Sequence, residues 1–463
     1  MFTRANALDQ WPLPITPLTQ DLVELPQERG LEAAFVSVLG VSKPSPEWTW
    51  NGCFFGYVMF GVTPAAALAD NLPGWSRAGV YADYLGVRPD PDAPPEQQKV
   101  DPVGLMRIGG KFLSAMRTYP RRAEAEITAA RSQLDADRAR NWGDVTDGYL
   151  LDRIDASHDT QMWQRVPHAV ASVIGAALFK QLNQSLVRLA GDDDGPRLAT
   201  EMITPLGGVH MRDAIDAMAD VASGRLSREV FLHDYGFRGN NEFELAARPW
   251  HDDPATLDRL IEAAGRSTTQ GGANGKESAR NRVRELAGWR WPLLRAHLAL
   301  TEKHLRWREN GKVPMAIGVA SIRLVVLEAA RRLVDRGRIG QLDDVFYLRK
   351  DELVQELSGA GPDDVDVRIT RRRATRQLAI EFPLPEIVDA TPAGICEVSE
   401  SRWKSLGLIP PEAADDETSV LVGVGGSRGS VTGRARIVTD PTDVEIDEGD
   451  ILVARGTDSA WTP

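Results

Sequence analysis

The sequence predicts an α+β fold in which a long helical region is followed by a small β-rich one. Helix-forming residues dominate from Val103 to about Ile380, and apolar residues there recur three and four positions apart. Two short β-rich runs, Val431 to Val438 and Ile451 to Ala454, are separated by turn signals such as Asp440-Pro441. The length of 463 residues suggests about two to four domains.

Composition and charge exclude several classes of protein. A net charge of −12 opposes nonspecific binding to nucleic acid, and we expect no nucleic-acid partner. Cys53 and Cys396 provide neither a disulfide framework nor the spacing of a zinc site, which favours a reducing, cytoplasmic location. The amino terminus lacks the apolar core of a signal peptide, and no eighteen uncharged apolar residues run together, so no membrane association is expected. The longest apolar candidate, Ala169 to Phe179, is predicted to be a buried helix.

Residues 1–100 are predicted to be a mixed region, which the family resemblance given below makes part of the substrate domain. The proline-punctuated stretch Trp11 to Leu18 is expected to be extended. Asn51-Gly52, between aromatic runs, predicts a tight hairpin turn. The aromatic side chains around it either pack the hairpin on the helices or form a wall for a flat, apolar substrate. The substrate-binding candidates among them are Trp50, Phe54 and Tyr57.

Residues 101–382 are predicted to form a helical domain, to which the family resemblance given below assigns substrate binding. One helix is predicted to end at Gly337, which suits a helix C-terminal cap. Its core stripe consists of Val319, Ile322, Val326, Ala329 and Leu333. A second helix is predicted from Arg280 to about Glu309, with a kink near Pro292, after a surface loop at Gly271 to Gly275. Breaker-rich residues 383–417 are predicted to be a linker that permits swivelling.

The end of the second helix carries the most chemically loaded group of residues. If the helix continues, His304, Arg308 and Lys312 lie on one face, with Glu309 about 100° round the helix. Two cations four residues apart repel by a few tenths of a kcal/mol, and an anion between them would remove that conflict. Arginine and lysine together can neutralise phosphoryl oxygens, and a carboxylate can orient or deprotonate a hydroxyl. The alternative is a solvated charged face.

Two other groups of residues allow a structural and a functional interpretation. In Tyr235 to Pro254, Arg238 either pairs with Glu242 or Glu244 as a buried brace or adds positive potential at a phosphoryl site. Trp307 either belongs to the core or contacts a substrate. No His, Asp and Glu grouping has convincing metal-ligand spacing, so no metal site is predicted.

Three segments of the chain resemble motifs of the phosphoenolpyruvate-utilising family, which includes pyruvate, water dikinase and rifampin phosphotransferase. They follow one another along the chain in the same order as in that family. Leu305 to Lys312 (LRWRENGK) is similar to its Arg-Glu-x-x-Lys motif, and Gln341 to Leu348 with Glu352-Leu353 to its DDVFYL-x-x-x-EL segment. Tyr235 to Pro254 resembles its YGxRGxxExEL run. Gly423 to Pro463 resembles the opening of the family's mobile phosphohistidine domain, before the segment that carries the histidine. Residues 418–463 are therefore expected to be the incomplete N-terminal part of that domain.

The resemblance implies a phosphotransferase of the dikinase type. Residues 1–200 do not resemble the family's ATP-grasp domain, and the chain has no P-loop. We therefore expect a separately encoded subunit, as in phenylphosphate or cresol-phosphorylating synthases, in which an ATP-grasp partner binds ATP and Mg²⁺ and this chain binds neither. A carrier histidine outside the sequence would then pass the phosphoryl group to phenol or cresol, with AMP and phosphate as the other products.

In that interpretation Arg308, Glu309 and Lys312 attend the transfer. Because phenols ionise near pH ~10, Glu309 or His304 as a base, together with the cations, would assist the attack. A larger apolar alcohol such as a rifamycin-like antibiotic remains open as the acceptor. So does a non-catalytic role as a docking or regulatory partner of an ATP-grasp protein.

Overall fold

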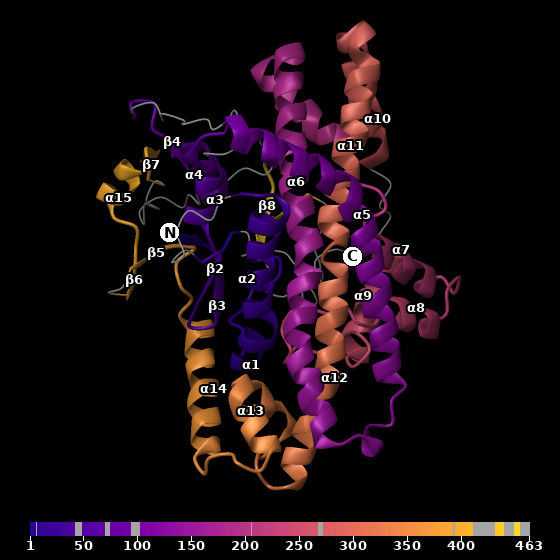
Figure 1. The fold of residues 1–463 in the computed structure, drawn as a ribbon. Coiled ribbons are helices and arrows are strands. Elements are labelled where there is room, and N and C mark those ends of the chain that lie inside the picture. Colours follow the sequence, from indigo (N-terminus) through magenta and orange to yellow (C-terminus); the bar gives the residue numbers. More distant parts are fainter. Residues whose placement is uncertain are drawn as a thin grey trace.

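A bundle of four long helices forms the centre of the computed structural model (Figure 1). These helices are α5 (Pro102–Arg138), α6 (Asp147–Ile203), α11 (Trp291–Asn310) and α12 (Val313–Asp335). The structure describes residues 1–5, 7–41, 49–69, 75–93, 102–204, 206–266, 272–391, 394–410, 431–438 and 449–453. The predicted α+β class, mostly helical, is confirmed.

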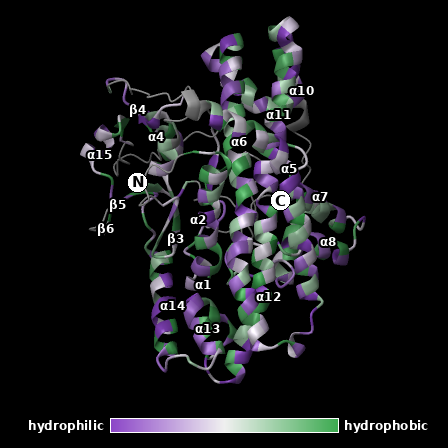
Figure 2. Ribbon diagram, in the orientation of Figure 1, coloured by the Kyte–Doolittle hydropathy of each residue, from purple (hydrophilic) through white to green (hydrophobic). Residues whose placement is uncertain are grey.

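The helix α12 forms the core of the bundle. All five residues of its predicted stripe are at most 3% exposed, and Gly337 has a φ of 66°, which ends the helix as expected. Figure 2 shows apolar colour along α12, whereas the outer helix α14 (Val365–Glu381) carries much hydrophilic colour. The helical stretch Gly275–Asp335 is long and apolar enough to cross a membrane, but 83% of its most apolar window is buried inside the molecule. That burial is typical of a core helix.

The predicted helix from Arg280 to Glu309 is divided into two. Helix α10 (Gly272–Ala287) is followed by a single 3-10 turn, η5 (Gly288–Arg290), and then by α11. The break lies before Pro292 because Gly288 has a φ of 53°, and the proline is then accommodated in the first turn of α11. The surface loop predicted at Gly271 to Gly275 is wrong for residues 272–275, which begin α10; Gly271 lies outside the described residues.

A five-stranded sheet holds the N-terminal region. Its order is β2-β3-β1-β5-β6, and its strand pairs are antiparallel. β1 (Phe2–Thr3) lies between β3 (Tyr57–Gly61) and β5 (Ile387–Thr391), while β2 (Asn51–Phe54) and β6 (Gly394–Cys396) are at the edges.

The hairpin of β2 and β3 turns at a different place from the prediction. Asn51 and Gly52 lie inside β2, and the turn residues are Phe55 and Gly56, with φ angles of 51° and 86°. A two-residue hairpin turn of this hand requires positive φ at both positions. Gly56 is packed so closely on the N-terminal loop that its carbonyl accepts a hydrogen bond from the Ile15 N–H at 2.8 Å. Tertiary contact with that loop therefore outweighs the local Asn-Gly signal.

The predicted linker 383–417 contains regular structure. β5 pairs with β1, and β7 (Leu408–Ile409) pairs with β4 (Arg88–Pro89). α15 (Glu400–Ser405) buries Trp403 in an apolar cluster with residues of the N-terminal region. The breakers mark turns between short elements, so residues 387–409 are built onto the N-terminal region; residues 411–417 lie outside the described ones.

The small β tail is described only in part. β8 (Arg434–Ile437) and β9 (Asp450–Val453) coincide with the two predicted β-rich runs, and they pair in parallel. The remaining residues on which the resemblance to a phosphohistidine domain depends, including Ser427, Gly429 and Thr457 to Pro463, lie outside the described residues.

The other elements lie around the bundle and sheet. They are α1 (Pro17–Thr19), η1 (Gln20–Glu24), α2 (Leu25–Glu32), η2 (Ala33–Val38), α3 (Val62–Leu68), α4 (Arg77–Leu85), η4 (Trp142–Asp144), α7 (His210–Ala222), α8 (Arg228–Tyr235), α9 (Pro254–Arg266), η6 (Leu342–Tyr347) and α13 (Lys350–Leu357). η1 and η2 are π-helical segments, which often occur at functional sites.

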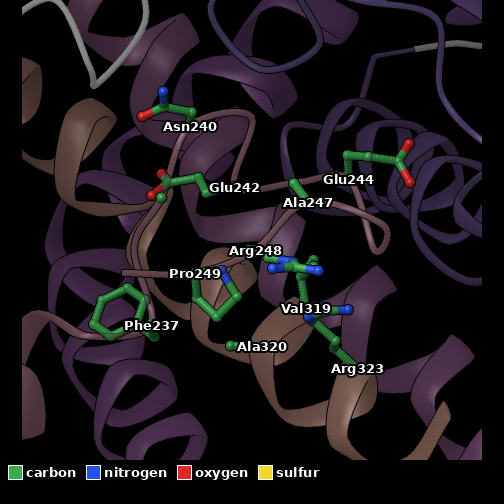
Figure 3. Close-up of a pocket in the computed structure, with 11 residues that line it drawn as sticks. Phe237, Asn240, Glu242, Glu244, Ala247, Arg248, Pro249, Val319, Ala320 and Arg323 are labelled. Atoms are coloured by element: carbon green, nitrogen blue, oxygen red, sulfur yellow. The ribbon is translucent and has the colours of Figure 1, made fainter. Parts of the chain in front are cut away.

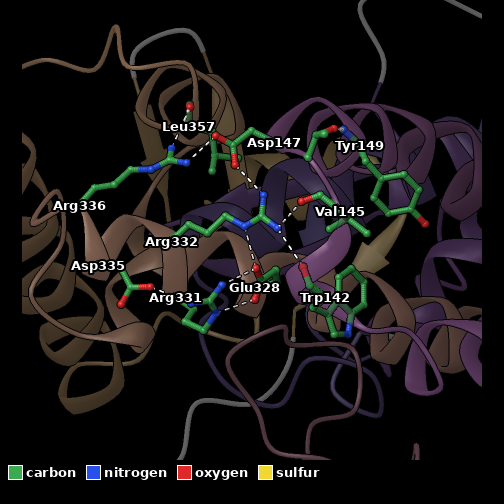
Figure 4. Close-up of polar contacts among 11 residues, drawn as sticks. Trp142, Val145, Asp147, Tyr149, Glu328, Arg331, Arg332, Asp335, Arg336 and Leu357 are labelled. Atoms are coloured by element: carbon green, nitrogen blue, oxygen red, sulfur yellow. Dashed lines mark hydrogen bonds and ion pairs between the residues drawn. The ribbon is translucent and has the colours of Figure 1, made fainter.

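An ion-pair network fastens the start of α6 to the end of α12 (Figure 4). The Arg332 guanidinium donates to Glu328 and to Asp147, each at 2.7 Å, and to the carbonyls of Trp142 and Val145. These bonds use its planar fork in several directions, so the network fixes the lower end of the bundle.

Candidate active site

The charged group predicted at the end of α11 lies at a helix junction. α11 ends at Asn310, Gly311 follows, and Lys312 immediately precedes α12. The condition on which His304, Arg308 and Lys312 would share one helix face, that the helix continues through Lys312, is therefore not met. Gly311 is required here because a Cβ would lie 2.8 Å from the Cα of His168, on α6. The junction is thus pressed against the middle of α6.

The junction nevertheless brings the two predicted cations to one carboxylate. Glu309 places one oxygen 3.5 Å from Arg308 Nε and the other 3.3 Å from Lys312 Nζ. Lys312 also donates to Asp9 at 2.5 Å. Burial disfavours the ammonium, but Asp9 and Glu309 outweigh it and raise the pKa of Lys312, which is therefore charged at neutral pH. Arg308, with 48% of its side chain exposed, opens the group to solvent.

Two α6 residues that sequence reasoning missed line the inner side of this group. Arg165 is 7% exposed and donates from Nη1 to Gln10 at 2.9 Å. The ring of His168 bonds through Nδ1 to the Arg308 carbonyl at 2.7 Å. Burial, with the charges of Arg165 and Lys312, holds the pKa of His168 well below its usual range, so the ring is neutral and Nδ1 carries the donated proton. The sequence signal was a charged residue within an otherwise apolar helical run.

His304 lies outside the charged group. It is 1% exposed on the side of α11 that faces α6, and its Nε2 has no partner among the described residues. Burial, with a smaller effect of Lys303, lowers its pKa to about 4. No contact between described residues joins its ring to Arg308 or Lys312.

Arg238 forms a buried brace. Both oxygens of Glu242 accept from its Nη1, at 2.9 and 3.0 Å, and its Nη2 lies 3.2 Å from Nδ1 of His210. The backbone N–H of His210 donates to the Asn310 side-chain oxygen at 2.8 Å, so the brace reaches α11 one residue beyond Glu309. Glu244 forms no ion pair among the described residues and instead accepts from Thr16 and Thr19.

The loop after Arg238 encloses a small cavity against α12 (Figure 3). In the close-up, Phe237 and Pro249 lie on one side and Arg323 reaches in from α12. Its volume of about 10 Å³ is room for a single water at most. This cavity is therefore too small to hold an acceptor.

The predicted aromatic candidates pack against their own neighbours. Trp50 stacks on Phe35 at 4.3 Å between ring centroids, and Phe54 meets the edge of Phe2 at 5.2 Å. Tyr57 is 2% exposed and donates its hydroxyl to the Ala379 carbonyl at 2.9 Å. Trp307 is half-buried on α11. The packing interpretation accounts for the hairpin aromatics in this structure.

An apolar cluster lies beside the charged group, because α6 contributes to both. Val166, Ala169 and Val170 are neighbours of Arg165 and His168 on that helix and are at most 3% exposed. This cluster is part of the packed core. Its buried members are Leu31, Ala34, Phe35, Leu39, Val41, Trp50, Ala115, Val166, Ala169, Val170, Ile174 and Leu178.

Comparison with known proteins shows what the chain is similar to. Residues 209–309, which include Arg308 and Glu309, match the rifampicin phosphotransferase fourth domain. The chain is similar over part of its length to proteins named rifampicin phosphotransferase. The rifampicin phosphotransferase of Bacillus cereus is 26% identical over 320 residues, which are 65% of this chain and 34% of that protein. The predicted resemblance to the phosphoenolpyruvate-utilising family is confirmed.

Other relatives cover less of the chain. An uncharacterized protein of Mycobacterium tuberculosis is 32% identical over 227 residues, 49% of this chain and 23% of that protein. The prodigiosin synthesizing transferase PigC of Serratia marcescens is 26% identical over 255 residues, half of this chain and 26% of that protein. The chain spans about one third of the length of the rifampicin phosphotransferases it matches.

The cofactor expectation is not decided by this structure. Among the described residues no group of three or more His, Cys, Asp and Glu side chains could hold a metal ion. The predicted dependence on ATP and Mg²⁺ bound by an ATP-grasp partner therefore remains a prediction.

Proposed function

We propose that this chain is the acceptor-binding part of a phosphotransferase and that Arg308, Glu309 and Lys312 form its transfer site. The observation that carries the proposal is the arrangement of two cations on one carboxylate at the α11–α12 junction. This group begins within the stretch shared with proteins named rifampicin phosphotransferase.

The three side chains suit the charge changes of phosphoryl transfer. An acceptor hydroxyl oxygen forms the new bond to phosphorus while the bond from phosphorus to the carrier histidine nitrogen breaks. Arg308 and Lys312 neutralise the oxygens of the group in flight. Glu309, held between them, accepts or orients the hydroxyl proton. The carrier histidine and the ATP-dependent step belong to parts of the machinery outside this sequence.

The relatives favour a rifamycin-like acceptor over the phenol or cresol implied by the resemblance to separately encoded synthases. The curated relatives with 25 to 27% identity over 280 to 320 residues are named rifampicin phosphotransferases. A docking or regulatory role leaves the charged group unexplained.

The acceptor can be identified by mass spectrometry. The chain would be incubated with ATP, Mg²⁺ and an ATP-grasp protein that carries a phosphohistidine domain, together with equal concentrations of rifampicin and phenol. We expect rifampicin to gain one phosphoryl group. Phosphorylated phenol alone would overturn the choice of acceptor. Phosphorylation of neither compound, although the carrier histidine is charged, would overturn the proposed function.

A further inference from the structure

Arg165 is a buried cation without a carboxylate partner. Only Nη1 forms hydrogen bonds among the described residues, to the neutral Gln10 and weakly to the Met315 sulfur, while Nε has no partner. No carboxylate of the described residues lies within the 4.0 Å of an ion pair. Arg238 and Arg323, which are similarly buried, have carboxylates at 2.9 Å and 4.0 Å. Moving an unpaired charge from water into the protein interior costs roughly several kcal/mol of desolvation free energy.

The surrounding carboxyl groups do not supply the missing charge. Asp9 and Glu24 are the acidic groups that act on Arg165. Asp9 is bound to Lys312, and burial raises the pKa of Glu24 to about 8, so Glu24 is uncharged at neutral pH. The charged group therefore holds three cations, Arg165, Arg308 and Lys312, against two anions, Asp9 and Glu309.

Arg165 and Lys312 both bind side chains of the N-terminal loop that contains Asp9 and Gln10. Asp9 contacts Lys312, and its neighbour Gln10 contacts Arg165. The charges of both cations act on His168, a buried residue of α6 that packs against the junction at Gly311. Because Nη1 donates to Gln10, the Nε and Nη2 donors on the other edge of the guanidinium have no partner among the described residues. Two donors on one edge match two oxygens of a phosphoryl group.

We propose that Arg165 is the inner ligand of a phosphate-binding pocket that it forms with Lys312, and that inorganic phosphate is its minimal occupant. The inference rests on the proposed function, because the phosphoryl group in transfer is the intended occupant. Arg308 then meets the phosphoryl group from the solvent side and Arg165 from the buried side. Arg165 would thus be a fourth residue of the transfer site, in addition to Arg308, Glu309 and Lys312, and it would bind the transferred group directly.

Titration calorimetry with inorganic phosphate tests the pocket. The chain would be titrated at constant ionic strength as the wild type, Arg165→Met and the control Arg323→Met, which removes an equally buried guanidinium 11 residues from Lys312 in the sequence. Truncating one partner of a buried charge pair weakens binding strongly, so we expect at least a tenfold loss for Arg165→Met. Arg323→Met should bind phosphate as the wild type does. Unchanged affinity in Arg165→Met, or no binding by the wild type, overturns the proposal.

Thermal unfolding without phosphate separates this role from a structural one. Because the charge is unpaired, Arg165→Met should keep or raise the Tm, whereas a structural brace would lose stability. If Arg165→Met does not fold, Arg165→Lys keeps the charge without the fork and should still weaken phosphate binding. Phosphate binding through Arg165 without any transfer would leave this pocket standing and reject the proposed function. If Arg165→Met changes neither the transfer rate nor the phosphate affinity, the proposed function stands and the role of Arg165 is rejected.

Discussion

Glu24 offers a stability test of the interior next to Arg165. This carboxyl ends the π-helical segment η1 and is 1% exposed. Burial, helped by the charge of Glu28, raises its pKa to about 8 from a usual 4.5. Since the folded pKa lies above the unfolded one, folding takes up a proton between about pH 4.5 and pH 8. Glu24 therefore imposes no cost below pH 4.5, a cost that grows as the pH rises, and a constant cost above pH 8.

The magnitude follows from the difference between the two pKa values. At pH 7 the solution is about 2.5 units above the unfolded pKa of 4.5, so keeping Glu24 protonated costs about 3 kcal/mol of folding free energy. Above pH 8 it reaches about 5 kcal/mol. Glu24→Gln keeps the shape of the neutral carboxyl and needs no proton. The variant should therefore gain about 3 kcal/mol over the wild type at pH 7 and close to nothing at pH 4.5.

Urea unfolding followed by circular dichroism at pH 5, 7 and 8.5 measures this difference. The control is Glu262→Gln, which removes an exposed carboxyl from α9 and should leave the pH dependence of the wild type unchanged. If the wild type and Glu24→Gln show the same pH dependence, then Glu24 is charged in the folded protein. The count of three cations against two anions around Arg165 would then be wrong.

Two further predictions concern the ion pairs of the helical region. Arg332→Met removes the partner that Glu328 and Asp147 share, but Arg331 still pairs with Glu328 and Arg336 with Asp147. The variant should therefore lose about 1.5–3 kcal/mol in the free energy of urea unfolding at pH 7; an unchanged free energy of unfolding would show that the network is not stabilising. Burial disfavours the Glu352 carboxylate, but Arg372 and other donors outweigh it and lower its pKa to about 2, so its contribution of about 3 kcal/mol is present above pH 4.5 and lost as the pH falls toward 2. Glu352→Gln should lose that acid dependence in unfolding at pH 2 to 5, and an unchanged dependence would refute the assigned pairing.

The helical fold was predictable where one local signal was enough. The apolar stripe of α12 and the cap at Gly337 followed from periodicity and from one residue that tolerates positive φ. The hairpin turn was misplaced because Phe55 and Gly56 are fixed by contact with Ile15, which no local pattern shows. The linker 383–417 was misassigned because pairing of β5 with β1 joins residues more than 380 positions apart.

The candidate site was predictable only on its own helix. Arg308, Glu309 and Lys312 are neighbours in sequence, so spacing and family resemblance both pointed to them. Asp9 and Arg165 join them from loops and helices far away in sequence. His304 has the right spacing, but the packing of α11 on α6 turns it into the interior instead.

The most direct test of the account is the rate of phosphoryl transfer to rifampicin by Lys312→Met. The matched control is Lys303→Met, which removes an exposed ammonium from α11. Removing one group that stabilises charge in the transition state typically costs about 100-fold or more, so we expect such a loss for Lys312→Met and none for the control. Equal transfer rates for the two variants, both folded, would contradict the assignment of the α11–α12 junction as the transfer site.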